Sequence, residues 1–480
     1  MADRSRSILC QHLLPLACLT VLCGCVQGPD YVKPEVAVPG AYRTDIAPLE
    51  NAALVDESQW WGQFQDPYLD GLVDEALANN RNLMIASARV DEFTAILAGT
   101  RSQGLPQVGY ALSAGGSHQS EAVLPSFIDP TSASFSTILS ASWELDLWGR
   151  IRRETEAARA NLLATDEARR GVTLTIISSV VTSYITLLDL DQQLRVTDAT
   201  IEGRRHSVAL FEERLEAGWI SEFEMSQVQA EYEAAVAQRP PILQAIATQE
   251  NALSVLVGRN PGPVGRAPTF DALAMPTVPA GLPSELLIRR PDIQQAEQQL
   301  IASNALIGAA RSLFFPRISL TSLLGLISPS LDGLFSGNAG TWSFTGDVVG
   351  PIYTGGGVQA AVDQAEARRD QSFANYELVI QNAFRDVEDS LSDLQHSGEL
   401  RDAVQRRVGT LRRSVELATE RYDNGYADYI DVLDAERSLF SAELQLASAR
   451  GNYDRALVNL YRALGGDWTS AAAVADATGG

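Results

Sequence analysis

Residues 135–150 read FSTILSASWELDLWGR and change period within one short stretch. From Phe135 to Leu147, mostly apolar side chains alternate with polar ones, which is the two-residue period of a strand with one apolar and one polar face. Beyond Gly149 the spacing becomes that of a heptad, with apolar residues at Leu174, Ile177, Val181, Tyr184 and Leu188. The passage therefore predicts a barrel-type strand that leads directly into a long helix.

The same strand-to-helix passage occurs again from Thr341, and its helix begins at Val358. Matching residues lie 210 positions apart before the strand hairpins and 207 apart after them: Arg101 and Arg311, Pro106 and Pro316, Gly149 and Gly356, Gly218 and Gly425, Leu253 and Leu460. Accidental matches at a constant offset over this length are improbable. We therefore interpret the chain as an internal duplication.

Each repeat is expected to contain a helix, two strands, a long helix and a further helix. The first repeat, 60–265, has strands at 107–117 and 133–147 and helices at 150–200 and 205–257. The second, 284–468, has strands at 316–325 and 341–352 and helices at 358–400 and 405–464. Residues 266–283 are expected to form a proline- and glycine-rich linker, and 469–480, which have no recognisable pattern, a disordered tail.

Local signals define several element ends. Asp66 and Pro67 suit the start of a helix that is expected to run to about Arg101. The first long helix is expected to turn back between 198 and 203, and Pro240-Pro241 to break or kink the helix after it.

The net charge limits the classes of partner. The chain has 480 residues, with 60 acidic against 37 basic side chains and a formal net charge of −23. Nucleic-acid binding and electrostatic docking on anionic lipid both need a basic surface, so neither is expected. Most of these carboxylates are expected to form a solvated surface.

All four cysteines lie in the first 25 residues. Basic residues precede an apolar stretch at 8–21, which is typical of a secretory signal. The following Leu22-Cys23-Gly24-Cys25 matches a bacterial lipobox, so 1–24 would be a lipoprotein signal peptide and Cys25 would carry a covalent lipid such as palmitate. Residues 25–59 would then be a lipidated, extended tether, and an ordinary signal peptide or an uncleaved anchor is the alternative.

The four strands suit an outer membrane, but four cannot close a barrel, and open edges are not tolerated in lipid. Three chains would supply twelve strands. A helix of about 60 residues spans roughly 90 Å. The expected fold is thus a mixed α and β membrane protein: a homotrimeric, 12-stranded barrel in outer-membrane lipid, continued by a long α-helical barrel in the periplasm.

One stretch has a competing interpretation. Residues 171–188 are uncharged over 18 positions, which is near the minimum for a transmembrane helix. However, they include seven serine and threonine residues, and the matching stretch 378–395 carries five charged ones. A coiled coil is therefore preferred for both copies.

Several motifs carry a resemblance to a known family. They are GLPSELL at 281–287, RRPDI at 289–293, DLWGRI at 146–151 and DVLDA at 431–435. With Cys25 and the Trp60-Trp61 element, they resemble the TolC-like outer-membrane efflux proteins, in particular the lipoprotein branch typified by OprM and NodT. The resemblance implies a homotrimeric channel-tunnel that docks a periplasmic adaptor protein and an inner-membrane pump of the resistance-nodulation-division class. It would conduct drugs or other small molecules passively, as in multidrug resistance.

Three groups of candidate site residues follow. Glu144, Asp146 and Asp347 alternate with the apolar strand row, so they are expected to line the barrel lumen and favour cations or only to hydrate its wall. The resemblance implies a periplasmic aperture, for which the candidates are Arg385, Asp386, Glu388, Asp389 and Asp393; an exposed coiled-coil flank is the alternative. Bends near the hairpin tips, which in the family meet the adaptor, are indicated by Arg214, Gly218, Arg421 and Gly425.

Enzymatic and metal-binding functions find no support in the sequence. His118, His206 and His396 are scattered without ligand spacing, and no phosphate loop or nucleophile elbow occurs. No cofactor is expected apart from the lipid on Cys25. The alternatives to an efflux channel are a type I secretion exit duct and a structural envelope lipoprotein, of which the second leaves the alternating strands unexplained.

Overall fold

A computed structural model describes residues 26–43, 57–120, 122–123, 125, 129–268, 270 and 286–466. The chain divides into two compact units. We call Met1–Glu35, Arg89–Asp166 and Gln295–Glu377 the sheet unit, and Val36–Ala88, Glu167–Gln294 and Leu378–Gly480 the hairpin unit. The signal peptide, Cys25, most of the expected linker and the C-terminal tail lie outside the described residues.

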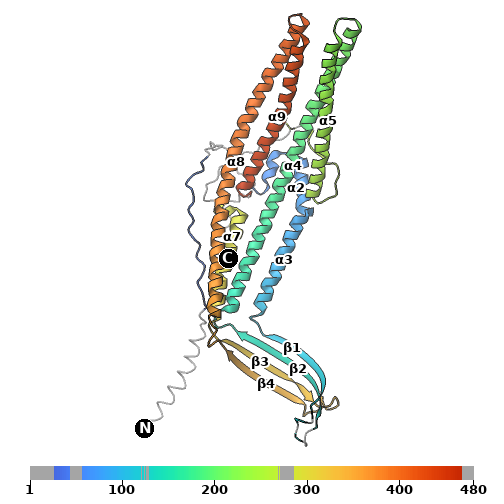
Figure 1. The fold of residues 1–480 in the computed structure, drawn as a ribbon. Coiled ribbons are helices and arrows are strands. Elements are labelled where there is room, and N and C mark those ends of the chain that lie inside the picture. Colours follow the sequence, from blue (N-terminus) through green and yellow to red (C-terminus); the bar gives the residue numbers. More distant parts are fainter. Residues whose placement is uncertain are drawn as a thin grey trace. The chain divides into compact units, whose positions relative to one another are not determined.

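The sheet unit contains one four-stranded antiparallel sheet with strands in sequence order (Figure 1). The strands are β1 (Gln107–His118), β2 (Thr131–Leu145), β3 (Arg317–Ser328) and β4 (Gly340–Val349). Their ends lie within three residues of the ranges expected from the alternating pattern. The strands β2 and β3 pair with one another, so the two repeats are joined within one sheet.

The strand register sorts the side chains of the sheet onto two chemically different faces. One face is apolar and carries Val108, Tyr110, Leu112, Leu139, Trp143, Leu320, Leu324, Trp342, Phe344 and Val348. The other is rich in hydroxyl groups and carries Ser113, Ser136, Ser140, Ser142, Thr321, Ser343 and Thr345. The apolar face is open in the single chain, where Tyr110 is 80% and Trp342 77% exposed, so it requires a covering phase such as lipid.

Two helical hairpins of matching length form most of the hairpin unit (Figure 1). The helices α4 (Arg150–Glu216) and α8 (Gly357–Asp423) have 67 residues each, and α5 (Glu222–Leu256) and α9 (Tyr429–Ala463) have 35 each. The expected ends of the long helices near 200 and 400 were wrong. A mid-helix glycine such as Gly203 costs only about 1 kcal/mol, so it does not end a helix whose neighbours pack.

The expected break at Pro240-Pro241 was also wrong, because α5 continues through both prolines. The two residues remove only two backbone donors from a helix of 35 residues. Buried Ala235, Ile242 and Ile246 flank them and hold the helix against its neighbours. Packing on both sides therefore outweighs the local cost.

The core of the hairpin unit is built around the apolar stretch of α4. Its largest cluster joins residues of η1 (Glu57–Phe64), α2 (Pro67–Asn79), α4, α5 and α9: Trp60, Phe64, Leu69, Val73, Val180, Tyr184, Leu188, Leu253, Leu457 and Tyr461. By length and composition alone, α4 could cross a membrane, but half of that window is buried inside the protein. The apolar run is explained by packing, in agreement with the preferred interpretation.

The single helix expected from Pro67 to Arg101 is in fact two helices, α2 and α3 (Arg81–Ser102). Asp66 caps α2 as expected, because its side chain accepts a hydrogen bond from the Tyr68 amide. The break lies at Asn80, whose Oδ1 accepts from the backbone amides of Asn82 and Leu83 and whose Nδ2 donates to the Leu256 carbonyl, 2.6 Å away. Asparagine is a strong N-cap, so a side chain rather than proline divides the helix.

We predict that Asn80→Ala destabilises the hairpin unit, because it removes the cap of α3 and leaves the Leu256 carbonyl without this donor. The expected loss is roughly 1–3 kcal/mol in the free energy of unfolding, measured by chemical denaturation in detergent. Asn82→Ala is the matched control, since Asn82 is exposed and contributes only its backbone amide to the cap. Equal stability of the two variants would contradict the prediction.

Candidate functional site

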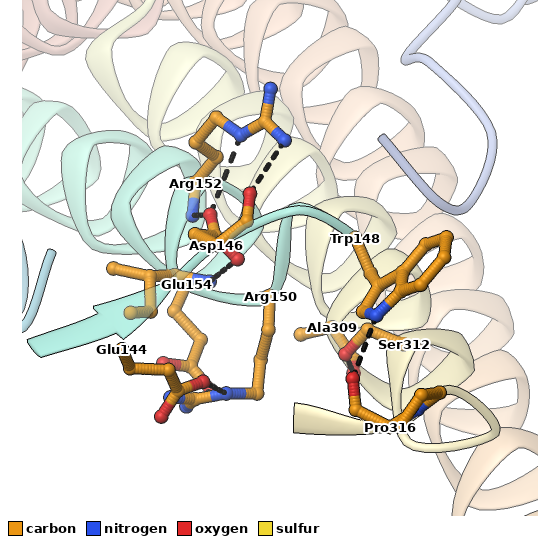
Figure 2. A network of polar contacts seen from close by, with 10 residues as sticks. Glu144, Asp146, Trp148, Arg150, Arg152, Glu154, Ala309, Ser312 and Pro316 are labelled. Atoms are coloured by element: carbon orange, nitrogen blue, oxygen red, sulfur yellow. Dashed lines mark hydrogen bonds and ion pairs between the residues drawn. The ribbon is translucent and has the colours of Figure 1, made fainter. Parts of the chain in front are cut away.

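The junction between β2 and α4 is held by paired charges (Figure 2). The Asp146 carboxylate accepts hydrogen bonds from the amides of Ile151 and Arg152 at 3.1 and 2.9 Å, so it caps α4. Its carboxylate also forms an ion pair with the Arg152 side chain at 3.4 Å. A negative group at a helix N-terminus is favoured by the helix dipole, so the strand is fixed to its helix.

Glu144 lies two residues before Asp146, on the hydroxyl-rich face of the sheet. Its carboxylate forms an ion pair with Arg150 at 2.9 Å, and Arg150 forms a second ion pair with Glu154 at 3.0 Å. Asp347 on β4 shares this face, because both Glu144 and Asp347 pair with Ser319 across β3. Glu144 and Asp146 each have an arginine partner that offsets their charge. That all three carboxylates face the lumen and favour cations stays a prediction.

The junctions of the two repeats are joined through Trp148. Its indole Nε1 donates to the Pro316 carbonyl at 2.8 Å (Figure 2). Its ring also stacks on Phe315, with centroids 4.6 Å apart. Pro316 immediately precedes β3, so the start of one helix is tied to the start of a strand in the other repeat. The DLWGRI sequence thus has a structural role at this boundary.

The described start of the tether, residues 26–33, is docked on the sheet unit rather than free. The buried Arg153 side chain donates to the carbonyls of Gln27 and Gly28 at 3.0 and 3.2 Å and pairs with Asp30 at 2.8 Å. Asn304 donates to the Pro29 carbonyl at 3.0 Å. The segment is extended, as expected, but it follows a fixed path over α4 and α7 (Pro291–Ser312).

Two glycines make this close docking possible. A Cβ on Gly308 would lie 2.3 Å from the Gln27 carbonyl oxygen, and one on Gly149 would lie 2.9 Å from the Val26 side chain. Further along, Lys33 pairs with Glu297 at 2.7 Å. The contact of Val26 with Gly149 places Val26 at the junction between β2 and α4.

The acidic residues proposed for the aperture do not lie at the end of α8. The helix continues to Asp423, so 385–393 lie near its middle, and the structural premise of that prediction was wrong. The Arg385 guanidinium forms an ion pair with Asp386 at 2.8 Å and lies 3.9 Å from the Asp389 carboxylate. The Glu388 carboxylate accepts a hydrogen bond from the Arg43 backbone amide at 2.6 Å. The Asp393 side chain is exposed. The role of these five residues at an aperture stays a prediction, and it no longer has the support of a nearby helix end.

The RRPDI motif explains part of this region. Arg290, which is 8% exposed, pairs with Asp292 at 2.7 Å and with Asp386 at 3.2 Å and donates to the Ala463 carbonyl at 3.0 Å. It therefore fastens the start of α7 to α8 and α9. Sequence reasoning singled out the motif but not Asp386 as its partner, because 96 positions separate the two residues.

The bends marked by Arg214, Gly218, Arg421 and Gly425 are the hairpin tips. Gly218 and Gly425 have φ angles of +73° and +74°, which suit glycine. In both tips the glycine amide donates to the carbonyl three residues earlier, and the next amide donates to the arginine carbonyl at 2.9 or 2.8 Å. This is a Schellman ending, so the repeated spacing encodes one turn twice.

The two hairpins are linked close to these tips. The Arg214 Nη1 donates to the Tyr422 hydroxyl at 2.6 Å, and the Phe211 ring lies 4.2 Å from the Tyr429 ring. We call Phe211, Arg214, Tyr422 and Tyr429 the hairpin clamp. Burial raises the pKa of the Tyr429 phenol. Sequence analysis missed the clamp because its rings lie on different helices.

A second link lies farther from the tips. Glu231 on α5 pairs with Arg204 on α4 at 3.2 Å and with Arg437 on α9 at 2.6 Å. Beyond the clamp, large apolar side chains are open to solvent: Trp219 is 79%, Phe223 70% and Tyr426 78% exposed. Each tip therefore presents an aromatic residue directly after its glycine, at matching positions of the two repeats.

Among the described residues, no group of three or more His, Cys, Asp and Glu side chains could hold a metal ion.

Comparisons with known proteins give a consistent result. The family model described as "Outer membrane efflux protein" matches residues 72–259 and 282–466. The cation efflux system protein CusC of Escherichia coli O6:H1 is 38% identical over 461 residues, which cover 95% of this chain and 98% of that protein. The solvent efflux pump outer membrane protein SrpC of Pseudomonas putida is 36% identical over 463 residues, with 95% and 98% coverage.

Solved structures agree with the sequence matches. A crystal structure of CusC has a TM-score of 0.82 at 36% identity and covers 91% of this chain and 99% of its own. The outer-membrane channel OprN has a TM-score of 0.83 at 30% identity, with 92% and 100% coverage.

We predict that Arg153→Ala releases the tether, because the Gln27 and Gly28 carbonyls lose their charged donor. A nitroxide attached at Val32→Cys, where the native side chain is 81% exposed, is expected to show a mobile spectral component. Loss of hydrogen bonds to a charged group corresponds to about a tenfold or larger rise in the undocked fraction. Arg159→Ala, at an exposed position of the same helix, is the control, and unchanged spectra in both variants would refute the docking.

Proposed function

Because this chain belongs to the outer membrane efflux protein family, we propose that three copies of it close one channel through the outer membrane. The chain is the outer-membrane component of an efflux system. The number of copies rests on the sheet, whose four strands are too few for a barrel and whose outer strands β1 and β4 each leave one edge unpaired. Three copies supply twelve strands without an edge in lipid.

The chemistry of the two faces of the sheet determines which face lines the channel. In a closed barrel the apolar face with Tyr110 and Trp342 turns to lipid, and the hydroxyl-rich face turns to the lumen. Hydroxyl groups hydrate the wall without adding charge, and hydrogen bonds such as that between Ser113 and Ser136, at 2.7 Å, satisfy some of them. Such a wall conducts chemically different solutes.

In this proposal, substrate selectivity is determined by a partner protein and not by the channel wall. Similar relatives carry names that refer to cations, solvents and toluene, at 36–38% identity over nearly the whole chain. A wall of one general chemistry is compatible with all of them. We therefore treat the chain as a passive duct without enzymatic activity, whose energy and selectivity come from an inner-membrane pump, with the resistance-nodulation-division class as the expected partner.

The lipid anchor fits the docked tether. Cys25, the residue proposed to carry the lipid, directly precedes Val26, which contacts Gly149 at the junction between β2 and α4. One residue spans about 3.8 Å, so the lipid would be attached close to the base of the barrel. Acyl chains at that position enter the same membrane that the strands cross.

The hairpin tips are proposed to dock the periplasmic adaptor. The observation that carries this assignment is the pair of exposed aromatic side chains, Trp219 and Tyr426, on turns of identical geometry. Arg214, Gly218, Arg421 and Gly425 shape these turns, and the aromatic rings offer the contact area. Exposed aromatic residues of this kind are enriched in protein interfaces.

A photoreactive amino acid placed at Trp219 or Tyr426 is expected to capture one periplasmic adaptor protein in intact cells, identified by mass spectrometry. Leu400 in α8 is the control position, because it is 46% exposed but lies 23 residues before the end of the helix (423 − 400). Equal capture at all three positions, or none from lipidated protein in the outer membrane, would overturn docking at the tips.

The hairpin clamp is proposed to restrict opening at the periplasmic end. Arg214→Ala removes the hydrogen bond to Tyr422, so the two hairpins are expected to separate more easily and the single-channel conductance in planar bilayers to rise several-fold. Arg421→Ala is the matched control, because its contact is with the Tyr426 carbonyl of its own tip at 3.4 Å. The same conductance change in both variants would argue against the clamp.

A further inference from the structure

Asp454 on α9 is a buried carboxyl group without a hydrogen-bond partner. Its side chain is 1% exposed. In the part of the chain that the structure describes, neither carboxyl oxygen has a hydrogen-bond partner. An unpaired, ionised carboxylate is strongly disfavoured in such surroundings, so the group must be neutral or its surroundings must open.

Charged groups on three helices surround Asp454 but do not satisfy it. They are Asp189 on α4, Arg401 on α8, and Arg450 and Arg455 on α9 itself. Each arginine has other contacts: Arg401 lies over the Tyr453 ring at 4.2 Å, Arg450 donates to Gln405 at 3.1 Å, and Arg455 donates to Asn452 at 2.7 Å. These arginines therefore attract the Asp454 carboxylate electrostatically, without a direct hydrogen bond to it.

The second acid, Asp189, marks a tight contact between α4 and α9. It is 5% exposed, accepts from Gln193 at 2.9 Å and lies 3.5 Å from the Arg455 guanidinium. Gly451 packs directly on it, since a Cβ there would lie 2.9 Å from Asp189 Oδ2. At this point α4 and α9 leave no room for a side chain between them.

The duplication shows that the fold itself does not need a carboxyl group at this position. At the offset of 207 residues, Asp454 matches Ala247 on α5 (454 − 207). Asp189 matches His396, so neither acid is repeated. The buried acid belongs to one hairpin only and destabilises it whenever it is charged, so packing of the helix does not explain its presence.

We propose that Asp454 is a proton-binding site that holds α9 against α4 and α8 in acid and loosens this contact when the proton leaves. Desolvation by burial raises the pKa of the Asp454 carboxyl to about 7, despite the nearby arginines. When the contact opens, the carboxyl is hydrated and its pKa returns toward the ordinary value near 4. Protons therefore bind the packed state more tightly than the open state.

The direction of the pH dependence follows from this difference. Below about pH 4 both states are protonated and the packed state has its full stability. Between about pH 4 and 7 only the open state is ionised, so its population rises by up to tenfold per pH unit and then levels off above pH 7. Stability of the contact is thus lost as pH rises.

Hydrogen exchange of α9 amides in the complete, detergent-solubilised protein tests this site without any transport assay. After correction for intrinsic exchange, we expect the opening equilibrium around Asp454 to rise roughly fiftyfold from pH 5 to 7 in the unmodified chain. In Asp454→Asn the profile is expected to be flat. Asp454→Ala, which copies the side chain that the other repeat carries at Ala247, provides a second neutral variant if the asparagine variant does not fold.

Asp370→Asn is the control, since this side chain on α8 is 69% exposed and is expected to leave the profile unchanged. A flat profile in the unmodified chain would overturn the proposal. So would a rise that persists in both neutral variants, because it would assign the titration to another group. These outcomes are independent of whether the hairpin tips dock an adaptor.

Discussion

The open edges of a four-stranded sheet are the constraint on which the other features depend. In lipid, an unpaired backbone amide or carbonyl costs several kcal/mol, so the outer edges of β1 and β4 demand pairing with further strands. Closure through copies of the same chain satisfies both edges at once. It also explains why the register separates an apolar face from a hydroxyl-rich one. At the end of β2, Asp146 and Trp148 hold the start of α4 against the sheet unit.

The two-residue alternation of apolar and polar side chains predicted the strands well. The constant sequence offsets between matching residues predicted the duplication. The helix turns were harder, because a glycine alone is an ambiguous signal. Gly203 has Thr410 as its counterpart at the offset of 207, whereas Gly218 is matched by Gly425. Only a position that needs a positive φ excludes other residues in both repeats, and this applies to the Schellman turns. The requirement that both copies keep glycine separates the real turns from the tolerated mid-helix residue.

The sequence pattern did not predict which residues contact one another across long sequence separations. The acids at 385–393 were assigned from local charge and an expected helix end, but Asp386 is a partner of Arg290 and Glu388 accepts from the tether backbone. Likewise, the buried Tyr184 hydroxyl donates to Asp66 at 2.5 Å, across 118 positions. Heptad spacing indicates that such residues face a neighbour. It does not specify which neighbour, because that depends on how several helices pack together.

The two repeats have kept their geometry and diverged in chemistry. Helices of equal length end in equal turns, yet Trp219 stands where the other tip has Tyr426, and the capping box of Ser221 with Glu224 is replaced by Asp428, whose side chain makes no capping bond. Backbone geometry must be equal for two hairpins to pack as neighbours in one wall, whereas exposed and buried side chains are free to differ. A ring of three chains therefore presents two alternating kinds of tip, so a partner that contacts every tip must accommodate two surfaces of one shape and unlike composition.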